Sequence, residues 1–247
     1  MDIDIKNLSP MMQNYIQTKE EYKDCILFYR LGDFYEMFFD DALLASKELE
    51  LTLTGKNCGL LERAPMCGVP FHAAENYINK LVAKGYKVAI CEQVEDPKLA
   101  KGLVKREVIR VATPGTNIDV ASLDESKNNY IMSIVYVLGN FGFAISDVTT
   151  GVFYVTEVNT LQKLTDEIYK FNPSEIICNE SFLLSGINTE ELRTKLSVTL
   201  YSLESWYFDD TACEDILKSH FKVTNLSGLG LHDLNCGKVA AGSLLKY

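Results

Sequence analysis

Residues 30–41 read RLGDFYEMFFDD. Four aromatic side chains lie within six positions of this stretch: Phe34, Tyr35, Phe38 and Phe39. They follow a Gly-Asp turn and the apolar run CILFYRL at 25–31, which predicts a buried strand. The carboxylate of Glu36 stands among the rings, and a charge inside a core is costly unless it is paired. The stretch therefore predicts either a packed core or an exposed site beside a turn.

The segments around this stretch predict an α/β domain. Ser9 and Pro10 are typical of a helix start, and the residues up to 24 follow helical spacing. Further helices are predicted at 40–50 and 72–85, and further strands at 51–54, 87–95 and 104–113. The Gly- and Pro-rich segment 55–72 predicts a long hairpin or loop.

The second half of the chain predicts another α/β domain with a mixed sheet. Three consecutive strands are expected between residues 130 and 159, and helices then alternate with strands. The polar stretch 116–129 breaks the pattern. We therefore expect domains at 1–115 and 129–247, joined by a linker at 116–128. The last helical pattern stops at the chain end, so we also expect a fragment of a longer protein.

Composition is that of a globular protein. Of the 247 residues 47% are hydrophobic and 23% charged, and no apolar run reaches the length of a membrane span. The acidic, polar N-terminus is unlike a secretory signal. The seven cysteines form an odd set without a C-x-x-C pair. This predicts reduced thiols in a cytoplasm instead of a disulfide frame or a zinc site.

Charge is unevenly distributed along the chain. The net charge is −10, which alone argues against nucleic acid as a partner. Residues 1–54 hold 5 Lys+Arg and 11 Asp+Glu, a balance of −6, and residues 115–247 hold 9 and 17, a balance of −8. Residues 55–114 hold 10 and 6, a balance of +4. A basic stretch lies between acidic ones, and whether it forms one face is not decided by a count.

Motifs for catalysis are few. Gly237-Lys238 lacks the Ser or Thr and the earlier Gly of a phosphate-binding loop. None of the three histidines belongs to a zinc-protease or nucleophile motif. Asp147, after a predicted strand, is the kind of carboxylate a metal-dependent nuclease uses, but one acid is too few for two metals, and turn chemistry explains it more simply. A nuclease stays open here as the alternative function.

Phe34 and Glu36 form a pair with a distinct chemistry if the chain is extended there. Residues two apart on a strand point to the same side, so a ring and a carboxylate would emerge together. A ring can wedge between bases and unstack them, whereas a carboxylate repels phosphate and can only accept a hydrogen bond from a base. Such a pair would discriminate against intact duplex. The alternative at this point is a core ring beside a helix-capping acid.

Three blocks of the first half carry a family resemblance. FYRLGDFYEMFFDDA, PMCGVPFHAAENYINKLVAKGYKVAICEQVEDP and KREVIRVATPGT resemble, in order and spacing, the N-terminal region of the MutS family of DNA mismatch-recognition proteins. ISDVTTGVFYV resembles the start of that family's connector domain. The resemblance implies a mixed-sheet α/β mismatch-recognition domain followed by an RNase-H-like α/β connector domain without nuclease activity.

The resemblance also implies roles for single residues. Phe34 and Glu36 occupy the family's Phe-x-Glu positions, where the ring enters the minor groove at a mismatch and the acid accepts a hydrogen bond from the mispaired base. Tyr35 is expected in the core. Further candidate DNA contacts, in or near the basic stretch, are Met66 beside the wedge and Lys56, Arg63, Arg106 and Arg110 at phosphates. No catalytic residue and no metal ligand is expected.

The family's other properties are expected outside these residues. ATP, Mg²⁺ and the main dimer contacts belong to core, clamp and ATPase domains that this chain lacks, so no cofactor and no enzymatic activity are expected in it. Mismatched duplex DNA and a MutL-like protein are the implied partners, in a bacterial cytoplasm at the nucleoid. A third hypothesis, compatible with the first, is that the acidic second half is a protein-interaction module.

Overall fold

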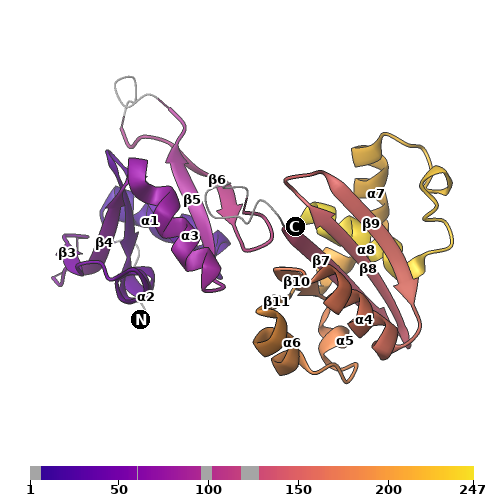
Figure 1. The fold of residues 1–247 in the computed structure, drawn as a ribbon. Coiled ribbons are helices and arrows are strands. Elements are labelled where there is room, and N and C mark those ends of the chain that lie inside the picture. Colours follow the sequence, from indigo (N-terminus) through magenta and orange to yellow (C-terminus); the bar gives the residue numbers. More distant parts are fainter. Residues whose placement is uncertain (1–6, 60, 96–101, 118–127) are drawn as a thin grey trace. The chain divides into compact units, whose positions relative to one another are not determined.

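The chain is described here from a computed structural model, which covers residues 7–59, 61–95, 102–117 and 128–247. It divides into two compact units, residues 1–117 and 118–247, each with its own sheet (Figure 1). Both sheets are mixed and carry helices on both faces, so the predicted α/β class of two mixed-sheet domains is confirmed. Most of the predicted linker, 118–127, lies outside the described residues.

The first unit is built on a six-stranded sheet in the order β3-β4-β2-β1-β5-β6. Strands β1 and β5 are parallel, and the other neighbours are antiparallel. The strands are β1 (Cys25–Leu31), β2 (Phe34–Phe38), β3 (Thr54–Lys56), β4 (Ala64–Pro70), β5 (Lys87–Gln93) and β6 (Arg106–Ala112). The helices are α1 (Pro10–Glu21), α2 (Phe39–Leu49) and α3 (Ala74–Ala83), with a short 3₁₀ turn, η2 (Phe71–Ala73), before α3.

Two cores lie on opposite faces of this sheet. On one face, alternate strand residues such as Phe28 and Met37 pack against α2 and α3. On the other face, Leu27 and Phe38 pack against Tyr15 of α1. The period-2 alternation thus lets the same strands supply both cores with alternate residues.

Helix α1 is fixed over its face by Asp41, a buried carboxylate in the first turn of α2. One carboxylate oxygen accepts from Lys19 of α1 at 2.9 Å, and the other accepts from the backbone N–H of Leu27 in β1 at 3.0 Å. The Tyr15 hydroxyl lies 3.3 Å from the same second oxygen. This acid in the first turn of α2 therefore ties α1, α2 and β1 together.

The second unit is built on a five-stranded sheet in the order β11-β10-β7-β8-β9. Strands β7, β8 and β9 form an antiparallel meander, and β10 and β11 run parallel to β7. The strands are β7 (Tyr130–Val137), β8 (Asn140–Asp147), β9 (Val152–Val158), β10 (Glu175–Cys178) and β11 (Thr199–Ser202). This is the predicted order of a meander followed by alternating helices and strands.

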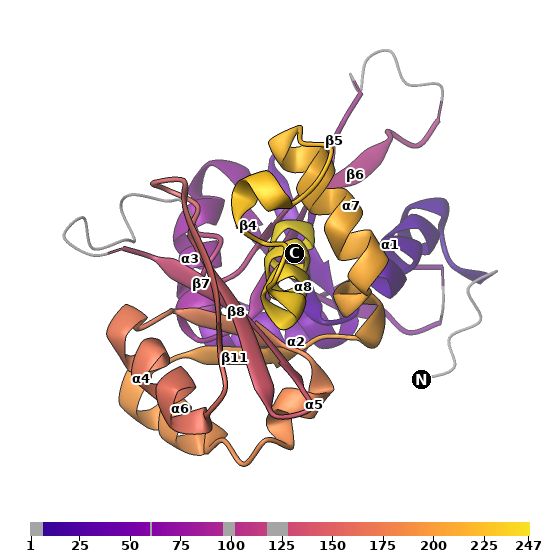
Figure 2. The same cartoon turned by 90° about the vertical axis from the view of Figure 1, so that its right-hand side faces the viewer.

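Five α-helices and two 3₁₀ turns are described in this unit. They are α4 (Leu161–Phe171), α5 (Glu180–Leu183), α6 (Thr189–Leu196), η3 (Ser205–Phe208), α7 (Asp210–Phe221), η4 (Ser227–Leu229) and α8 (Asn235–Lys246). The core on one face of the sheet draws on α4, α5 and α6, and the core on the other face draws on α7 and α8, which lie side by side (Figure 2). No described helix is long and apolar enough to cross a membrane.

Helix α8 approaches the sheet closely at one glycine. A Cβ built on Gly142 of β8 would lie 2.1 Å from the backbone carbonyl carbon of Cys236. Only a residue without a side chain fits there. The carboxylate of Glu157 in β9 accepts from the N–H of Gly237 at 2.8 Å, which places a negative charge at the helix N-terminus.

Secondary structure differs from the prediction mainly between residues 51 and 72. The strand predicted at 51–54 is observed at Thr54–Lys56, and the predicted long hairpin or loop contains β4, a seven-residue strand. Strand β2 and the short helix α5 also had no prediction of their own. Gly55, Gly68 and two prolines, Pro65 and Pro70, weakened the strand signal in a segment that is held in the sheet by pairing to β2.

The buried thiols give a prediction of low reactivity. All seven cysteines are free and buried, and desolvation raises the pKa of Cys25, Cys91 and Cys178 from 9.0 to about 12. Because the thiolate is the nucleophile, we expect iodoacetamide at about pH 8 to leave these three cysteines of the native chain unlabelled and to label them in urea. Mass spectrometry reads out each site. Modification of Cys25 in the folded chain would contradict the observed packing.

Candidate functional site

The hairpin of β1 and β2 presents Phe34 to solvent. Gly32 and Asp33 form its two-residue loop, and Gly32 has φ +59°, the positive value that a type II′ turn requires at its first position. Phe34 is the first residue of β2, pairs with Leu31, and is 46% exposed. The ring that could have been a core residue is thus exposed beside the turn.

Alternation along β2 separates two sets of side chains. Tyr35 and Met37 are buried on the face of α2 and α3, and Tyr35 is in the core as expected. Phe34, Glu36 and Phe38 are two apart and so share the other face. Tyr15 of α1 covers Phe38, with ring centroids 4.9 Å apart, and Phe38 is 1% exposed. The helix covers one end of this face and Phe34 is exposed at the other.

Arg30 fixes the turn that carries Phe34. Its Nε donates to the carbonyl of Gly32, its guanidinium lies 3.9 Å from the ring centroid of Phe71, and Nη1 lies 3.2 Å from a carboxylate oxygen of Glu92. The N–H of Phe71 donates to the carbonyl of Asp33 at 2.9 Å. The turn is therefore held by contacts from Phe71 of η2 and Glu92 of β5 as well as by its own hairpin.

Tyr35 contributes to the same cluster from the buried side. Its hydroxyl donates to Glu92 at 2.7 Å. Burial, and then the acceptor Glu92, raise the pKa of Tyr35 to about 12, so the phenol keeps its proton at neutral pH. This contact orients β2 directly behind Phe34 and Glu36.

Glu36 is partly buried and is paired. Its side chain is 16% exposed, and its Oε2 accepts a hydrogen bond from the ammonium of Lys56 in β3. Gly68 of β4 lies directly opposite Glu36, and a Cβ there would stand 3.5 Å from Cγ of Glu36 and 3.2 Å from the carbonyl of Tyr35. The sheet surface beside the carboxylate is therefore free of a β4 side chain.

The other candidate DNA contacts are divided between the two faces. Met66 of β4 pairs with Phe38 of β2, so it lies on the same face as Glu36. Along β4 it is two residues from Gly68, the partner of Glu36, and four residues from Pro70, the partner of Phe34. Arg63 is exposed, and its side chain lies against Gly55, the residue before Lys56. Met66 and Lys56 are thus brought toward Glu36, whereas the side chain of Arg63 is placed against the backbone of β3.

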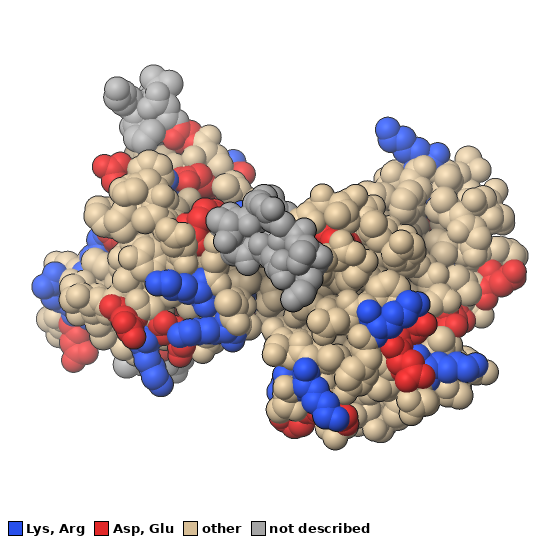
Figure 3. Space-filling view, viewed as in Figure 1, with Lys and Arg blue, Asp and Glu red and all other residues tan. Residues whose placement is uncertain are grey.

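Arg106 and Arg110 have partners within the protein. Arg106 donates to the backbone carbonyls of Arg30 and Val104, each at 2.7 Å, and its guanidinium lies 5.2 Å from the ring centroid of Tyr29. Nη2 of Arg110 donates to both carboxylate oxygens of Glu75 in α3, at 2.9 and 3.0 Å, so Arg110 lies on the face of α2 and α3. On the face of the molecule shown in Figure 3, Lys and Arg are interspersed with Asp and Glu.

Three contacts at this site had no prediction from sequence: Lys56 with Glu36, Gly68 opposite Glu36, and Arg30 with the turn. The first two depend on β4, which lay in the segment predicted as a loop. Residues 64–70, APMCGVP, show no alternation of polar and apolar residues, so the local pattern does not indicate this strand.

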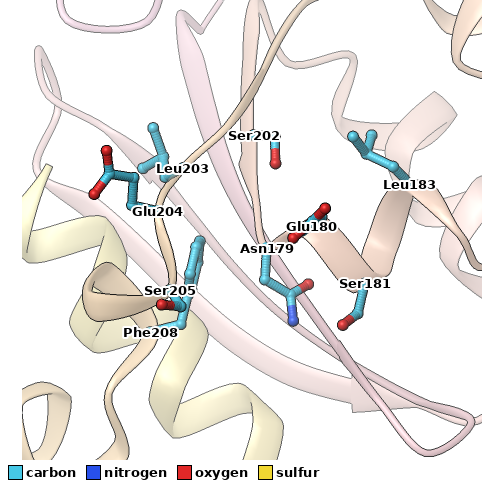
Figure 4. A pocket seen from close by; sticks show the side chains of 9 residues that line it. All are labelled: Asn179, Glu180, Ser181, Leu183, Ser202, Leu203, Glu204, Ser205 and Phe208. Atoms are coloured by element: carbon cyan, nitrogen blue, oxygen red, sulfur yellow. The ribbon is translucent and has the colours of Figure 1, made fainter.

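The second unit has an open pocket of about 770 Å³ at the carboxyl ends of β10 and β11. In Figure 4 the carboxylates of Glu180 and Glu204 lie on different sides of it and do not converge. The Asn179 amide bonds to the backbone of Tyr136, and Glu204 accepts from Trp206 at 2.9 Å. These polar groups are engaged by the fold and form no catalytic arrangement.

Asp147 is a turn residue of the second unit. Its carboxylate accepts from the hydroxyl and N–H of Thr149, at 2.6 and 2.9 Å, from the N–H of Asn129 at 3.2 Å and from that of Thr150 at 3.4 Å. Across the described residues no group of three or more His, Cys, Asp or Glu side chains could hold a metal ion. The nuclease alternative thus has no support in the described geometry.

Comparison with known proteins assigns the family. The model for MutS domain I matches residues 9–121, and the model for MutS domain II matches residues 129–247. The chain therefore belongs to the MutS family of DNA mismatch repair proteins, as its motifs predicted. It consists of domains I and II, and the family's ATPase domain is not among its residues.

Bacterial relatives agree with this assignment. The DNA mismatch repair protein MutS of Lachnoclostridium phytofermentans is 62% identical over 240 residues, which cover 97% of this chain and 26% of that protein. The proteins of the same name from Ruminiclostridium cellulolyticum and Acetivibrio thermocellus are 57% and 54% identical, over 97% and 98% of this chain. The chain spans about a quarter of the length of these relatives.

The environment of Asp147 gives a prediction for stability. Burial raises the pKa of Asp147, and the hydrogen bonds from Thr149, Thr150 and Asn129 lower it. The net effect is a lowered pKa. A carboxyl group whose pKa is lower in the folded chain than in the unfolded chain stabilises the fold at any pH above the unfolded-state pKa. This stabilisation is lost as the pH falls through the folded-state pKa. We expect Asp147→Asn to lower the free energy of unfolding by about 1–3 kcal/mol at neutral pH.

Urea unfolding at neutral pH and below about pH 3 measures this difference. The deficit of the Asn variant should shrink at the lower pH. Asp215→Asn, at an exposed position of α7, is the matched control and should change little at either pH. An equal deficit at both pH values would rule out the charge as its cause.

Proposed function

We propose that this chain reads mismatched or unpaired bases in duplex DNA, with Phe34 as a wedge and Glu36 as its polar partner. The observation that carries the proposal is the 46% exposure of Phe34 beside a fixed turn, with a carboxylate on the same face two residues later. Family membership supports it, since the relatives are named DNA mismatch repair proteins. An interior position for the ring would have opposed it.

The mechanism follows from the opposite preferences of the two side chains. Inserting a ring between base pairs costs a few kcal/mol of unstacking per step, and a mispaired step is already weakly stacked. The carboxylate gains only where a base offers a hydrogen-bond donor, because phosphate repels it. Binding is therefore favoured where the duplex deforms easily, and one pair of residues would serve many mismatches and small insertion loops.

We propose the surrounding residues as supporting contacts. Met66 would line the wedge from β4, and Arg63 and Arg106 would contact phosphates. The ammonium of Lys56, the other candidate, is bonded to Glu36. Arg110 would have to leave Glu75 to contact a phosphate.

The rest of the proposed function concerns the whole protein. We propose a mismatch-recognition domain at 1–115, a linker at 116–128 and a connector domain at 129–247. The connector would relay the state of the first domain to the remainder of the protein and to a MutL-like partner. ATP, Mg²⁺ and the main dimer contacts would belong to domains outside these residues, and the site of action would be the nucleoid of a bacterial cytoplasm.

Replacing the wedge tests the proposal directly. In a full-length family member carrying these residues, Phe34→Ala should reduce the preference for a duplex with one G·T mismatch over its paired counterpart. The expected loss is about 1–3 kcal/mol, the magnitude of one ring–base stack. Fluorescence anisotropy with both duplexes measures the ratio of dissociation constants. Tyr154→Ala, which removes a 53% exposed ring from β9, should leave the ratio unchanged. An unchanged ratio in the Phe34 variant would refute the wedge.

The 247-residue chain alone should bind DNA weakly. Its net charge is −10, and two of the arginines in its basic stretch are engaged by the protein. Phosphate contacts make binding fall with salt, so we expect the weak binding of paired duplex to disappear as salt is raised. A titration that showed tight, salt-insensitive binding would contradict this expectation.

A further inference from the structure

Lys56 and Glu36 form an ion pair at the centre of the proposed mismatch site. Lys56 lies in β3, the edge strand of the sheet, and its ammonium bonds to Oε2 of Glu36 two strands away. The ammonium also lies 5.6 Å from the ring centroid of Phe38. The side chains of Lys56 and Glu36 are 32% and 16% exposed, so the pair is partly shielded from water.

The geometry leaves half of the carboxylate available. Among the described residues, Oε2 of Glu36 accepts from Lys56 and Oε1 accepts no hydrogen bond. A carboxylate has enough lone pairs to accept bonds at both oxygens. Gly68, opposite Glu36, places no side chain on the surface next to it. A base edge could therefore bind Oε1 while Lys56 stays on Oε2.

We infer that Lys56 is a positioning residue for Glu36: it neutralises the carboxylate, holds Oε2 and so presents Oε1 to a mispaired base. The inference rests on the proposed function of Glu36. It differs from a phosphate contact, since the ammonium acts on DNA through the carboxylate. Two physical effects support it. An unneutralised acid beside the DNA backbone would repel any duplex, and a carboxylate held by a partner loses less side-chain freedom when a base binds.

The two roles of Lys56 predict different outcomes. A lysine that only contacts phosphate contributes equally to paired and mismatched duplex, because phosphate carries no sequence information. A lysine that positions Glu36 contributes more to the mismatched duplex, where the Glu36 bond to the base is made. The ratio of the two dissociation constants separates these roles, whereas either affinity alone does not.

The experiment is a double-mutant cycle in the full-length protein with the paired and G·T duplexes as probes. Lys56→Gln should lower the mismatch preference roughly two- to fivefold, the range of a partly exposed ion pair. In a Glu36→Gln background the same substitution should leave the preference unchanged, because Lys56 then has no carboxylate to hold. Lys56→Arg keeps the positive charge and should restore the preference. Thermal unfolding of each variant checks that the fold is retained.

Lys47→Gln is the matched control, since it removes one positive charge from the same unit at an exposed position of α2 that has no proposed role in binding. It should leave the mismatch preference unchanged. An equal loss of preference for Lys56→Gln with and without Glu36, or an unchanged or increased preference in Lys56→Gln, would overturn the inference. Phe34→Ala is measured alongside. If Phe34→Ala lowers the preference and Lys56→Gln does not, only the inference fails; if Phe34→Ala has no effect, the proposed function itself fails.

Discussion

The burial of Tyr35 and Met37 is the constraint on which the site depends. Both side chains of β2 enter the core shared with α2 and α3, and the hydroxyl of Tyr35 reaches Glu92. Because strand residues alternate, this burial forces Phe34 and Glu36 to the other face. A slip of one residue would put Glu36 into an apolar core and Tyr35 outside, which is strongly disfavoured. The exposed ring is thus a consequence of core packing by Tyr35 and Met37, one and three positions further along the same strand.

Ion pairs within the first unit offset part of the positive charge that is counted in its sequence. Residues 55–114 have a balance of +4, yet Arg110 is bound to Glu75 and Lys56 to Glu36. Arg106 is held by backbone carbonyls of the hairpin and of its own strand end. A linear count of charges therefore overstates the positive field that a DNA backbone would meet. It also conceals which cations are part of the fold.

Sequence reasoning reached much of this architecture because several signals agreed. The run at 25–31 coincides with β1, and Ser9-Pro10 marks the start of α1. The meander and the later alternation of helices and strands gave the mixed sheet of the second unit. Strand β4 could not be predicted because its glycine and prolines are tolerated only through pairing with β2 and β3, a long-range contact absent from local pattern.

The candidate site shows the same division between local and long-range information. The pattern Phe-x-Glu after a turn left exposed and buried alternatives open, since both fit a strand. Family resemblance favoured exposure, and the coordinates place the ring at 46% exposure. The partner of Glu36 lies 20 residues away, on a strand that reaches β2 only through β4, so no local rule could have found it.

A nearly neutral site suits discrimination better than a strongly basic one. Contacts to phosphate stabilise paired and mismatched duplexes alike, and thus raise affinity without raising preference. In the first unit the acid of the site is paired and the arginines nearby are largely committed to the protein. If the proposed function is right, the first domain contributes to the binding free energy mainly through the insertion of Phe34 and the bond to Glu36, and both depend on how readily the duplex deforms. Sequence-independent attraction would have to come from elsewhere in a full-length protein, where it can be strong without masking the difference that this domain detects.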